Sequence, residues 1–238
     1  MLRLLPVAIL AGGLATRLRA LSARRPKSLL EVAGRPFIFH QLDMLRSQGV
    51  DRVVLCLGHL GEQIRAAVAA AALPGLAVSY SFDGATLLGT GGALRQALPL
   101  LGEEFFVLNG DSYLPCSLAR IQAAYRQSRR PALMTVLRND NRWDRSNVLF
   151  RDGELLLYDK HAPRADMAHI DFGLAVLSRA VVARCPPATV VDLADILHEL
   201  SARGGLAGFE VSERFYEIGS PQGLQATEEF LAHRRTPA

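Results

Sequence analysis

Short apolar runs alternate with longer segments of helical periodicity over the first 137 residues, and this alternation constrains the fold more than any other feature. Runs such as residues 53–57 are apolar throughout, which is expected for strands buried on both faces of a parallel sheet. The alternation therefore predicts a mostly parallel sheet with helices on both faces. The expected strands are residues 7–10, 53–57, 77–82, 105–108 and 132–137, and the expected helices are residues 37–48, 62–72, 92–98 and 118–125.

The pattern changes character after residue 137. Asp152-Gly153 separates two short apolar runs and is the strongest short signal for a β-hairpin. A helix capped by Asp192 or Asp195 is expected to end before Gly204. The other elements expected here are strands at residues 148–151, 154–158, 170–177 and 206–211, and a closing helix at residues 221–232.

Together these patterns predict one α/β domain over residues 1–238. Its class is a Rossmann-like, doubly wound, mostly parallel sheet with a mixed β insertion. Residues 1–137 would form the doubly wound core, and residues 138–238 a mixed insertion that returns to the core. Ligands of such sheets bind at the carboxyl ends of the strands.

Composition excludes several functional classes. Half of the 238 residues are apolar, and the net charge is only +4. Basic residues occur in scattered pairs without interleaved aromatics, which argues against nucleic-acid binding. The three cysteines are widely spaced, so neither a disulfide framework nor a zinc site is indicated. The apolar N-terminus is too short to span a membrane and lacks a clear cleavage site. We expect a cytoplasmic protein, monomeric or a small homo-oligomer, with no membrane partner.

A glycine-rich loop follows the first expected strand, between Leu10 and Leu18. Glycines such as Gly12 and Gly13 let a backbone approach an anion and offer N–H groups to it, and Arg17 adds a planar cationic fork for phosphate oxygens. The loop matches neither the Walker nor the dinucleotide pattern, and by itself it is also compatible with a plain turn.

Two further segments carry candidate nucleotide contacts. Lys27 is one of only two lysines, and Pro26 stiffens the chain before it. The glycines at residues 89, 91 and 92 lead into an expected helix, where a flat base can lie against backbone. The alternative readings are a solvated lysine and a helix entry without a ligand.

Asp111 comes directly after the buried run 105–108, in Asn109-Gly110-Asp111. An acid at the carboxyl end of such a strand is placed to hold Mg²⁺ and its phosphates, although it can also cap the following turn. Three later segments are also candidates: Asp159-Lys160, which carries the second lysine, Asp171-Phe172-Gly173, and Glu217 before a Gly-Ser-Pro turn. Asp171-Phe172-Gly173 does not indicate a kinase, because no catalytic loop of kinase type precedes it.

In this order, the segments resemble the sugar-1-phosphate nucleotidyltransferases, the NDP-sugar pyrophosphorylases, from Val7 to about Phe230. The resemblance implies a phosphorus-group transferase of NDP-sugar and polysaccharide biosynthesis that uses NTP, a sugar 1-phosphate and Mg²⁺. It also implies nucleotide binding for residues 1–137 and sugar-phosphate binding for residues 138–238. Two positions depart from the family pattern: Ala15 stands where glycine is usual, and Glu217 where aspartate is usual.

The resemblance also implies roles for individual residues. Arg17, Lys27 and Asp111 would be catalytic, and Asp111 and Glu217 would hold the metal. The residues implied in nucleotide binding are Leu10, Ala11, Gly12, Gly13, Thr16, Asp83 and Gly89. Those implied in sugar-phosphate binding are Asn109, Asp159, Lys160, Asp171 and Gly173.

The resemblance is strongest to bacterial D-glycero-D-manno-heptose 1-phosphate guanylyltransferases. A carboxylate such as Asp83 accepts hydrogen bonds from adjacent N–H groups, which guanine offers. GTP and a heptose 1-phosphate are therefore the expected substrates. The alternatives are uridylyl transfer to another sugar 1-phosphate, such as a muramic acid phosphate, and a non-catalytic sensor on the same fold. A transferase that makes CDP-alcohols or joins GMP to a molybdenum cofactor is a further alternative, which Lys160 and Glu217 disfavour.

Overall fold

The apolar runs of the first half of the chain become neighbouring parallel strands. The structure, a computed structural model, describes residues 3–13 and 25–235. Strand β1 (Val7–Leu10) pairs in parallel with β4 (Arg52–Leu57) and with β6 (Glu104–Asn109). Strand β5 (Ala77–Phe82) extends this sheet beyond β4. The predicted parallel core is thereby confirmed, and its strands end at the edge where ligands are expected.

The second half adds a mixed set of strands to the same sheet. The long strand β11 (His169–Ser178) runs antiparallel to β6 and to β8 (Ala132–Arg138). Strand β12 (Leu206–Val211) pairs in parallel with β8. The hairpin predicted around Asp152-Gly153 is formed by β9 (Val148–Arg151) and β10 (Glu154–Tyr158). The result is one nine-stranded sheet that contains the expected mixed insertion.

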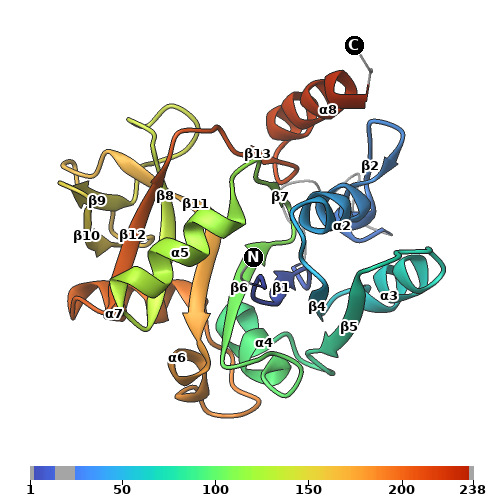
Figure 1. Ribbon diagram of the computed structural model, residues 1–238, viewed down its shortest axis with the longest axis horizontal. Coiled ribbons are helices and arrows are strands. Elements are labelled where there is room, and N and C mark those ends of the chain that lie inside the picture. Colours follow the sequence, from blue (N-terminus) through green and yellow to red (C-terminus); the bar gives the residue numbers. More distant parts are fainter. Residues whose placement is uncertain (1–2, 14–24, 236–238) are drawn as a thin grey trace.

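Helices cover both faces of this sheet (Figure 1). Side chains alternate along the strands, so that Val7 and Ile9 belong to one core cluster and Ala8 to the other. The first cluster includes side chains of α2 (Phe37–Ser47), α3 (Gly61–Ala69), α5 (Leu118–Ser128) and α8 (Pro221–Arg235). The second includes side chains of α4 (Gly89–Ala97), α6 (Arg179–Ala183) and α7 (Leu193–Ala202). This is the doubly wound arrangement that the sequence predicts.

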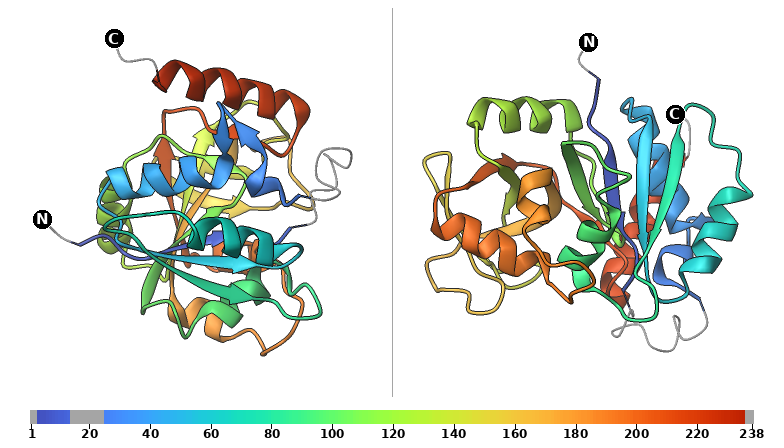
Figure 2. Two further views of the ribbon diagram at one scale, coloured as in Figure 1. Left: turned by 90° about the vertical axis from the view of Figure 1, so that its right-hand side faces the viewer. Right: turned by 90° about the horizontal axis from the view of Figure 1, so that it is seen from below.

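Several small elements were not expected from the sequence. They are the short helices η2 (Lys27–Leu29) and α6, and the two-residue strands β2 (Glu31–Val32), β3 (Arg35–Pro36), β7 (Ser112–Tyr113) and β13 (Tyr216–Glu217). The last helix, α8, lies over the β2–β3 hairpin (Figure 2), where the Ala33 amide donates to a Glu228 carboxylate oxygen at 2.6 Å. The C-terminal segment thus returns to the first half of the chain.

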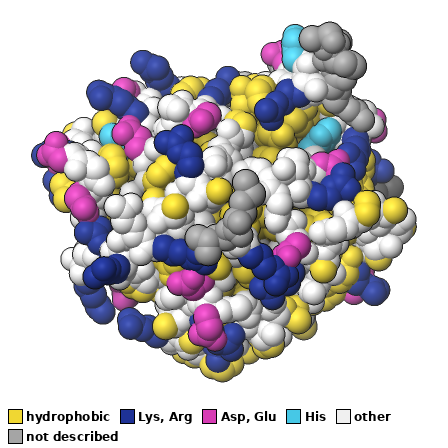
Figure 3. Space-filling view, viewed as in Figure 1, with side chains coloured by type: hydrophobic (Ala, Val, Ile, Leu, Met, Phe, Trp, Pro, Cys, Tyr) yellow, Lys and Arg dark blue, Asp and Glu magenta, His cyan; other side chains and the backbone are white. Residues whose placement is uncertain are grey.

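The surface shows mixed charge. On the face in Figure 3, basic and acidic side chains are interspersed.

Among the described residues, no helix is long and apolar enough to cross a membrane.

Candidate functional site

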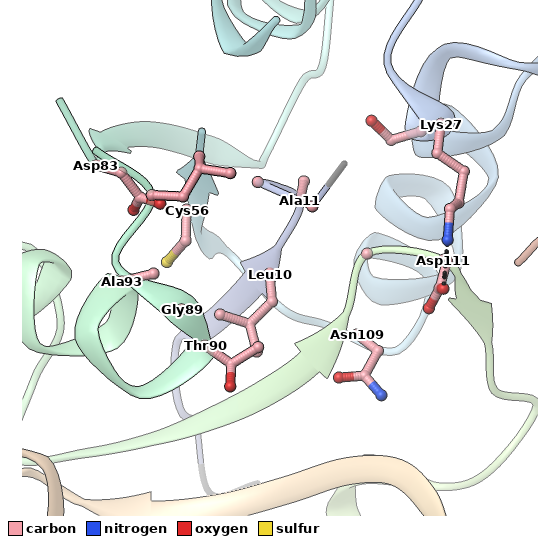
Figure 4. A pocket seen from close by; sticks show the side chains of 15 residues that line it. Leu10, Ala11, Lys27, Cys56, Asp83, Gly89, Thr90, Ala93, Asn109 and Asp111 are labelled. Carbon is pink, nitrogen blue, oxygen red and sulfur yellow. Dashed lines mark hydrogen bonds and ion pairs between the residues drawn. The ribbon is translucent and has the colours of Figure 1, made fainter. Parts of the chain in front are cut away.

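A cavity of about 320 Å³ opens at the carboxyl ends of β1, β4 and β6. We call it the donor pocket. Seen from close by, Leu10 and Ala11 lie between Asp83 and Cys56 on one side and Lys27 and Asp111 on the other (Figure 4). Burial raises the pKa of the Cys56 thiol to about 12, so Cys56 adds no charge of its own to the wall that it shares with Asp83. The pocket is lined by Leu10, Ala11, Gly12, Gly13, Lys27, Ser28, Cys56, Asp83, Leu87, Gly89, Thr90, Ala93, Asn109, Gly110 and Asp111.

The start of the glycine loop is fixed against the loop after β4. The Ala11 amide donates to the Cys56 carbonyl at 2.9 Å, and the His59 amide donates to the Gly12 carbonyl at 3.3 Å. A Cβ atom on Gly12 would lie 2.9 Å from the Gly58 nitrogen, whereas one on Gly13 would meet no atom of the described residues within 4 Å. The close approach therefore requires glycine at residue 12. The predicted sites Thr16 and Arg17, and the irregular Ala15, lie outside the described residues.

Lys27 and Asp111 form an ion pair in the donor pocket. The Lys27 Nζ lies 2.9 Å from Asp111 Oδ2, and both side chains are mostly buried, with 19% and 29% of their surface exposed. Lys27 is held by η2, and Asp111 lies in the turn between β6 and β7. The structure thus joins two residues that the sequence analysis singled out separately.

Glu217 is brought beside the Asp111 turn by a ladder of only two residue pairs. In the β7–β13 pair, Glu217 is opposite Ser112, and the Ile218 amide donates to the Asp111 carbonyl at 2.9 Å. The Glu217 carboxylate accepts from the Gly219 amide, from the Ser220 amide at 3.1 Å and from the Ser220 hydroxyl at 2.5 Å. Glu217 therefore also organises the entry into α8.

A larger cavity, of about 750 Å³, adjoins the donor pocket. We call it the acceptor pocket. It brings together the predicted residues Asn109, Asp111, Lys160, Asp171, Gly173 and Glu217. Thr90 and Leu10 join Asn109 and Asp111 in lining both pockets. The predicted residue Asp159 does not line either cavity: its Oδ1 accepts from the amides of His161 and Ala162, so it closes the turn that follows Lys160.

Asp192 links the two pockets, and sequence reasoning considered it only as a helix cap. Its Oδ2 lies 3.0 Å from Lys160 Nζ, and its Oδ1 accepts from the Thr90 hydroxyl at 2.8 Å. Asp192 is also the N-cap of α7, as expected, since its Oδ1 accepts from the Ala194 amide at 3.0 Å. Burial works to raise the Asp192 pKa, and the bonds from Ala194, Thr90 and Lys160 outweigh it and lower that pKa. Asp192 is therefore an ionised partner for Lys160.

Asp171 and Gly173 form a tight bend in β11 at the floor of the acceptor pocket. The Gly173 amide donates to Asp171 Oδ1 at 2.8 Å, and Asn147 Oδ1 accepts from the Asp171 amide at 3.0 Å. Burial raises the Asp171 pKa to about 6. Gly173 has a φ of +91°, and a Cβ there would lie 3.1 Å from the Asn109 amide nitrogen. The bend thus lets the Gly173 backbone approach the Asn109 side chain closely.

The predicted base-binding residues meet at the start of α4. Asp83 Oδ2 accepts from the Leu88 amide at 3.1 Å, and burial raises the Asp83 pKa. Gly89 has a φ of +70°, and a Cβ there would lie 2.6 Å from the Val191 carbonyl oxygen. The contact with Val191 by itself demands glycine at residue 89, whether or not a base lies there.

Sequence reasoning missed the residues that join these segments. Thr90, Asn147 and Asp192 line the acceptor pocket but carry no motif of their own, and the only signal was the cap position of Asp192. Trp143 also lines this pocket. Within the described part of the chain, no group of three or more His, Cys, Asp or Glu side chains is placed to hold a metal ion.

Comparison with known proteins identifies the family and its relatives. The sequence profile of the MobA-like NTP transferase domain matches residues 7–204. N-acetylmuramate alpha-1-phosphate uridylyltransferase of Caulobacter vibrioides is 28% identical over 234 residues, which cover 94% of this chain and 96% of that protein. D-glycero-alpha-D-manno-heptose 1-phosphate guanylyltransferase of Campylobacter jejuni is 32% identical over 114 residues, covering 48% of this chain and 51% of that protein.

A solved structure shares the fold over almost its whole length. HddC from Yersinia pseudotuberculosis, complexed with GMP-PN, superposes with a TM-score of 0.79 at 24% sequence identity. The match covers 95% of this chain and 99% of that one.

Proposed function

The chain belongs to the MobA-like NTP transferase family, and on this premise we propose that it transfers a nucleoside monophosphate from an NTP to a sugar 1-phosphate. The products are an NDP-sugar and pyrophosphate. One observation carries the proposal: Leu10, Thr90, Asn109 and Asp111 line both pockets, so that ligands in the two pockets lie against each other. Transfer between two phosphorylated substrates needs such an arrangement, because the reacting atoms must come within about 3–3.5 Å.

In this proposal the donor pocket holds the NTP. The backbone of Ala11, Gly12 and Gly13 cradles the triphosphate, with Thr16 and Arg17 completing the loop. Lys27 neutralises phosphate charge and is kept near the α-phosphate by its ion pair with Asp111. An incoming phosphate competes with Asp111 for the Lys27 ammonium, which leaves the Asp111 carboxylate available to a cation.

The acceptor pocket holds the sugar 1-phosphate. Lys160 binds its phosphate, while Asn109, Asp171 and Gly173 line the space for the sugar ring. Asp159 acts indirectly in this arrangement, since its turn fixes the chain that follows Lys160.

The chemistry requires no covalent intermediate. A phosphate oxygen of the sugar phosphate attacks the α-phosphorus of the NTP in line, a new P–O bond forms, and the bond to the β-phosphate oxygen breaks with that oxygen leaving in pyrophosphate. The attacking phosphate is already ionised near neutral pH, so no general base is needed. The protein contributes positioning and charge neutralisation.

The carboxylates of Asp111 and Glu217 fit Mg²⁺. Mg²⁺ prefers hard oxygen ligands and is usually bound by one or two carboxylates together with substrate phosphates and water. The β7–β13 pair sets Glu217 opposite Ser112, the residue after Asp111, and both acids line the acceptor pocket. Glu217 already accepts three hydrogen bonds, so Asp111 is the principal protein ligand in this proposal. Bound Mg²⁺ supplies charge neutralisation to the phosphates.

For the substrates, we propose GTP and a heptose 1-phosphate. Asp83 supports guanine, because its carboxylate lines the donor pocket and guanine offers adjacent N–H donors. The full-length similarity to a muramate 1-phosphate uridylyltransferase supports the alternative of UTP and a muramic acid phosphate.

The test is a panel of the four NTPs against sugar 1-phosphates that include heptose, mannose and muramic acid derivatives, with Mg²⁺ present. We expect pyrophosphate release, measured by a coupled assay, with one preferred pair. Folded protein that binds an NTP but releases no pyrophosphate with any acceptor would favour the sensor hypothesis over the transferase.

A further inference from the structure

A fully buried glutamine holds the turn that carries Asp111. Gln41 lies on α2 among apolar neighbours such as Ile38 and Leu42, and none of its surface is exposed. Burying an amide is unfavourable unless its polar atoms find partners. Its placement on the core face of α2 therefore demands an explanation in terms of its contacts.

The Gln41 side chain bridges the two ends of the Asp111 turn. Its Nε2 donates to the Asn109 carbonyl at 2.9 Å and to the Ser112 carbonyl at 2.7 Å. Both partners are acceptors, so only the amide nitrogen can face them, and this fixes the orientation of the amide. One NH₂ group thus sets the separation of the residues that flank Gly110 and Asp111.

The other half of the amide lacks a partner within the described part of the chain. Gln41 Oε1 is buried, and no atom of residues 3–13 or 25–235 forms a hydrogen bond with it. An unsatisfied buried acceptor is destabilising, because it loses its hydrogen bonds to water and gains none in the folded protein. A methionine or leucine at this position would fill similar space without that cost. Gln41 is therefore a poor choice for stability alone, and its contacts lie at the candidate site.

The same turn is fastened from two further sides. The Gly110 amide donates to the Leu10 carbonyl at 3.0 Å, and the Ile218 amide donates to the Asp111 carbonyl at 2.9 Å. Leu10 belongs to the glycine-loop strand, and Ile218 follows Glu217. The turn is consequently the point where the loop strand, α2 and the Glu217 ladder meet.

We propose that Gln41 is a positioning residue for the transfer reaction: its amide clamps residues 109–112 so that Asp111 faces the wall shared by the two pockets. This inference rests on the proposed function. Gln41 does not line either pocket, so it acts through Asp111 and Asn109. A displacement of about 1 Å at such a point is enough to lower a rate about a hundredfold.

The chain contains a matched control. Gln122 on α5 is also buried, with 3% of its surface exposed. It too bridges backbone, since Oε1 accepts from the Leu5 amide at 2.8 Å and Nε2 donates to the Arg3 carbonyl at 3.1 Å. It lines neither pocket. Gln41→Met and Gln122→Met thus remove equivalent bonds inside and outside the candidate site.

Three measurements on the two variants test the proposal. We expect Gln41→Met to lower kcat by about tenfold or more, to raise the Mg²⁺ concentration needed for binding of a non-hydrolysable NTP analogue, and to speed hydrogen exchange in peptides covering residues 104–113. Gln122→Met should leave all three at wild-type values. Unchanged kcat and analogue binding in Gln41→Met, or equal losses in both variants, would overturn the proposal.

The analogue-binding and exchange measurements do not depend on the acceptor. If wild-type protein turned over no sugar phosphate, the proposed function would fail, and Mg²⁺-dependent binding of the analogue in the two variants would still decide the role of Gln41. If Gln41→Met failed to fold, Gln41→Leu would provide the same comparison.

Discussion

At the scale of single residues, the Asp192 carboxylate competes with the acceptor phosphate for the Lys160 ammonium. Its carboxylate holds Lys160 at 3.0 Å, and it would repel an incoming phosphate. Asn is as good a helix cap as Asp, so Asp192→Asn keeps the bonds to Ala194 and Thr90 while removing the charge. We expect the acceptor KM to fall several-fold, because Lys160 loses its competing partner. Steady-state kinetics measure the acceptor KM of this variant, and an unchanged melting temperature serves as the control for intact folding. A higher KM would show instead that Asp192 orients Lys160 productively.

Asp171 gives the protein a predicted pH dependence of stability. Burial raises its pKa to about 6 in the folded state, from 3.8. A raised acid pKa means that the folded state binds the proton more tightly, so stability is greatest below pH 3.8 and falls as the pH rises through about 6. The loss is at most about 3 kcal/mol above pH 7.

Asp171→Asn should remove this loss while retaining an acceptor for the Gly173 amide. We expect the variant to exceed wild type in free energy of unfolding by a margin that grows from pH 4.5 to 7 and is constant above. Urea titrations across that range measure it, and a margin independent of pH would mean that Asp171 is not the titrating group. The KM of the Asp171→Asn variant for the acceptor should also rise, because the Asp171 carboxylate lines the acceptor pocket.

The sequence alone could identify residues with a local signal. Asp111 follows a buried strand, Lys27 and Lys160 are the only two lysines, and Gly173 ends a short motif with Asp171; the structure gathers all four at two adjoining cavities. Thr90, Gln41 and Asp192 were not identified as site residues, because their importance comes from partners far away in the sequence. A threonine or a buried glutamine has no local signature, and only the fold reveals what it contacts.

At the scale of elements, the loops after β1 and β4 touch at two glycines. A Cβ on Gly58 would lie 2.7 Å from the Gly12 carbonyl oxygen, and one on Gly12 would lie 2.9 Å from the Gly58 nitrogen. Gly12→Ala therefore pushes the two loops apart, and we expect a lower melting temperature and weaker NTP binding. A Cβ on Gly13 would contact none of the described residues within 4 Å, so Gly13→Ala should leave the melting temperature unchanged. Calorimetry and NTP titration compare the Gly12→Ala and Gly13→Ala variants. An equal fall in melting temperature in both would contradict a specific role for the contact between Gly12 and Gly58.

Element prediction succeeded where a local pattern was long or sharply punctuated. The hairpin at Asp152-Gly153 formed as expected, and β1, β5 and β12 have the predicted bounds. The ladder of β7 and β13 was missed because each strand has only two residues. Such a pair is determined by the packing of α8 and the Asp111 turn, which no window of sequence contains.

At the scale of the molecule, one sheet supports two pockets from different parts of the chain. The donor pocket is lined only by residues between Leu10 and Asp111, whereas the acceptor pocket also draws on β10, β11, α7 and the segment before α8. The alternation of strands and helices was sufficient to predict the first arrangement. The second depends on β11 running antiparallel beside β6, a pairing that hydrophobic patterns do not specify.

This division predicts that donor and acceptor recognition are separable. Trp143 is 42% exposed at the acceptor pocket, yet it is held by an edge contact to Phe215 at 5.9 Å and by Arg214 at 5.6 Å from its ring centroid. Phe215 in turn contacts the buried Phe172 at 6.1 Å. A ring held in this way is suited to pack on a sugar. Trp143→Ala should raise the acceptor KM by roughly two- to tenfold and leave NTP affinity unchanged.

Asp83→Asn provides the reciprocal variant. Asn retains an oxygen for the Leu88 amide but loses the carboxylate that would accept the guanine N–H groups. We expect the KM for GTP to rise by about tenfold, with the acceptor KM unchanged. Steady-state kinetics with each substrate varied in turn test both variants together. If either substitution changed both KM values equally, the shared wall at Thr90 and Asn109 would couple the pockets, and recognition of the nucleotide would depend on the bound sugar phosphate.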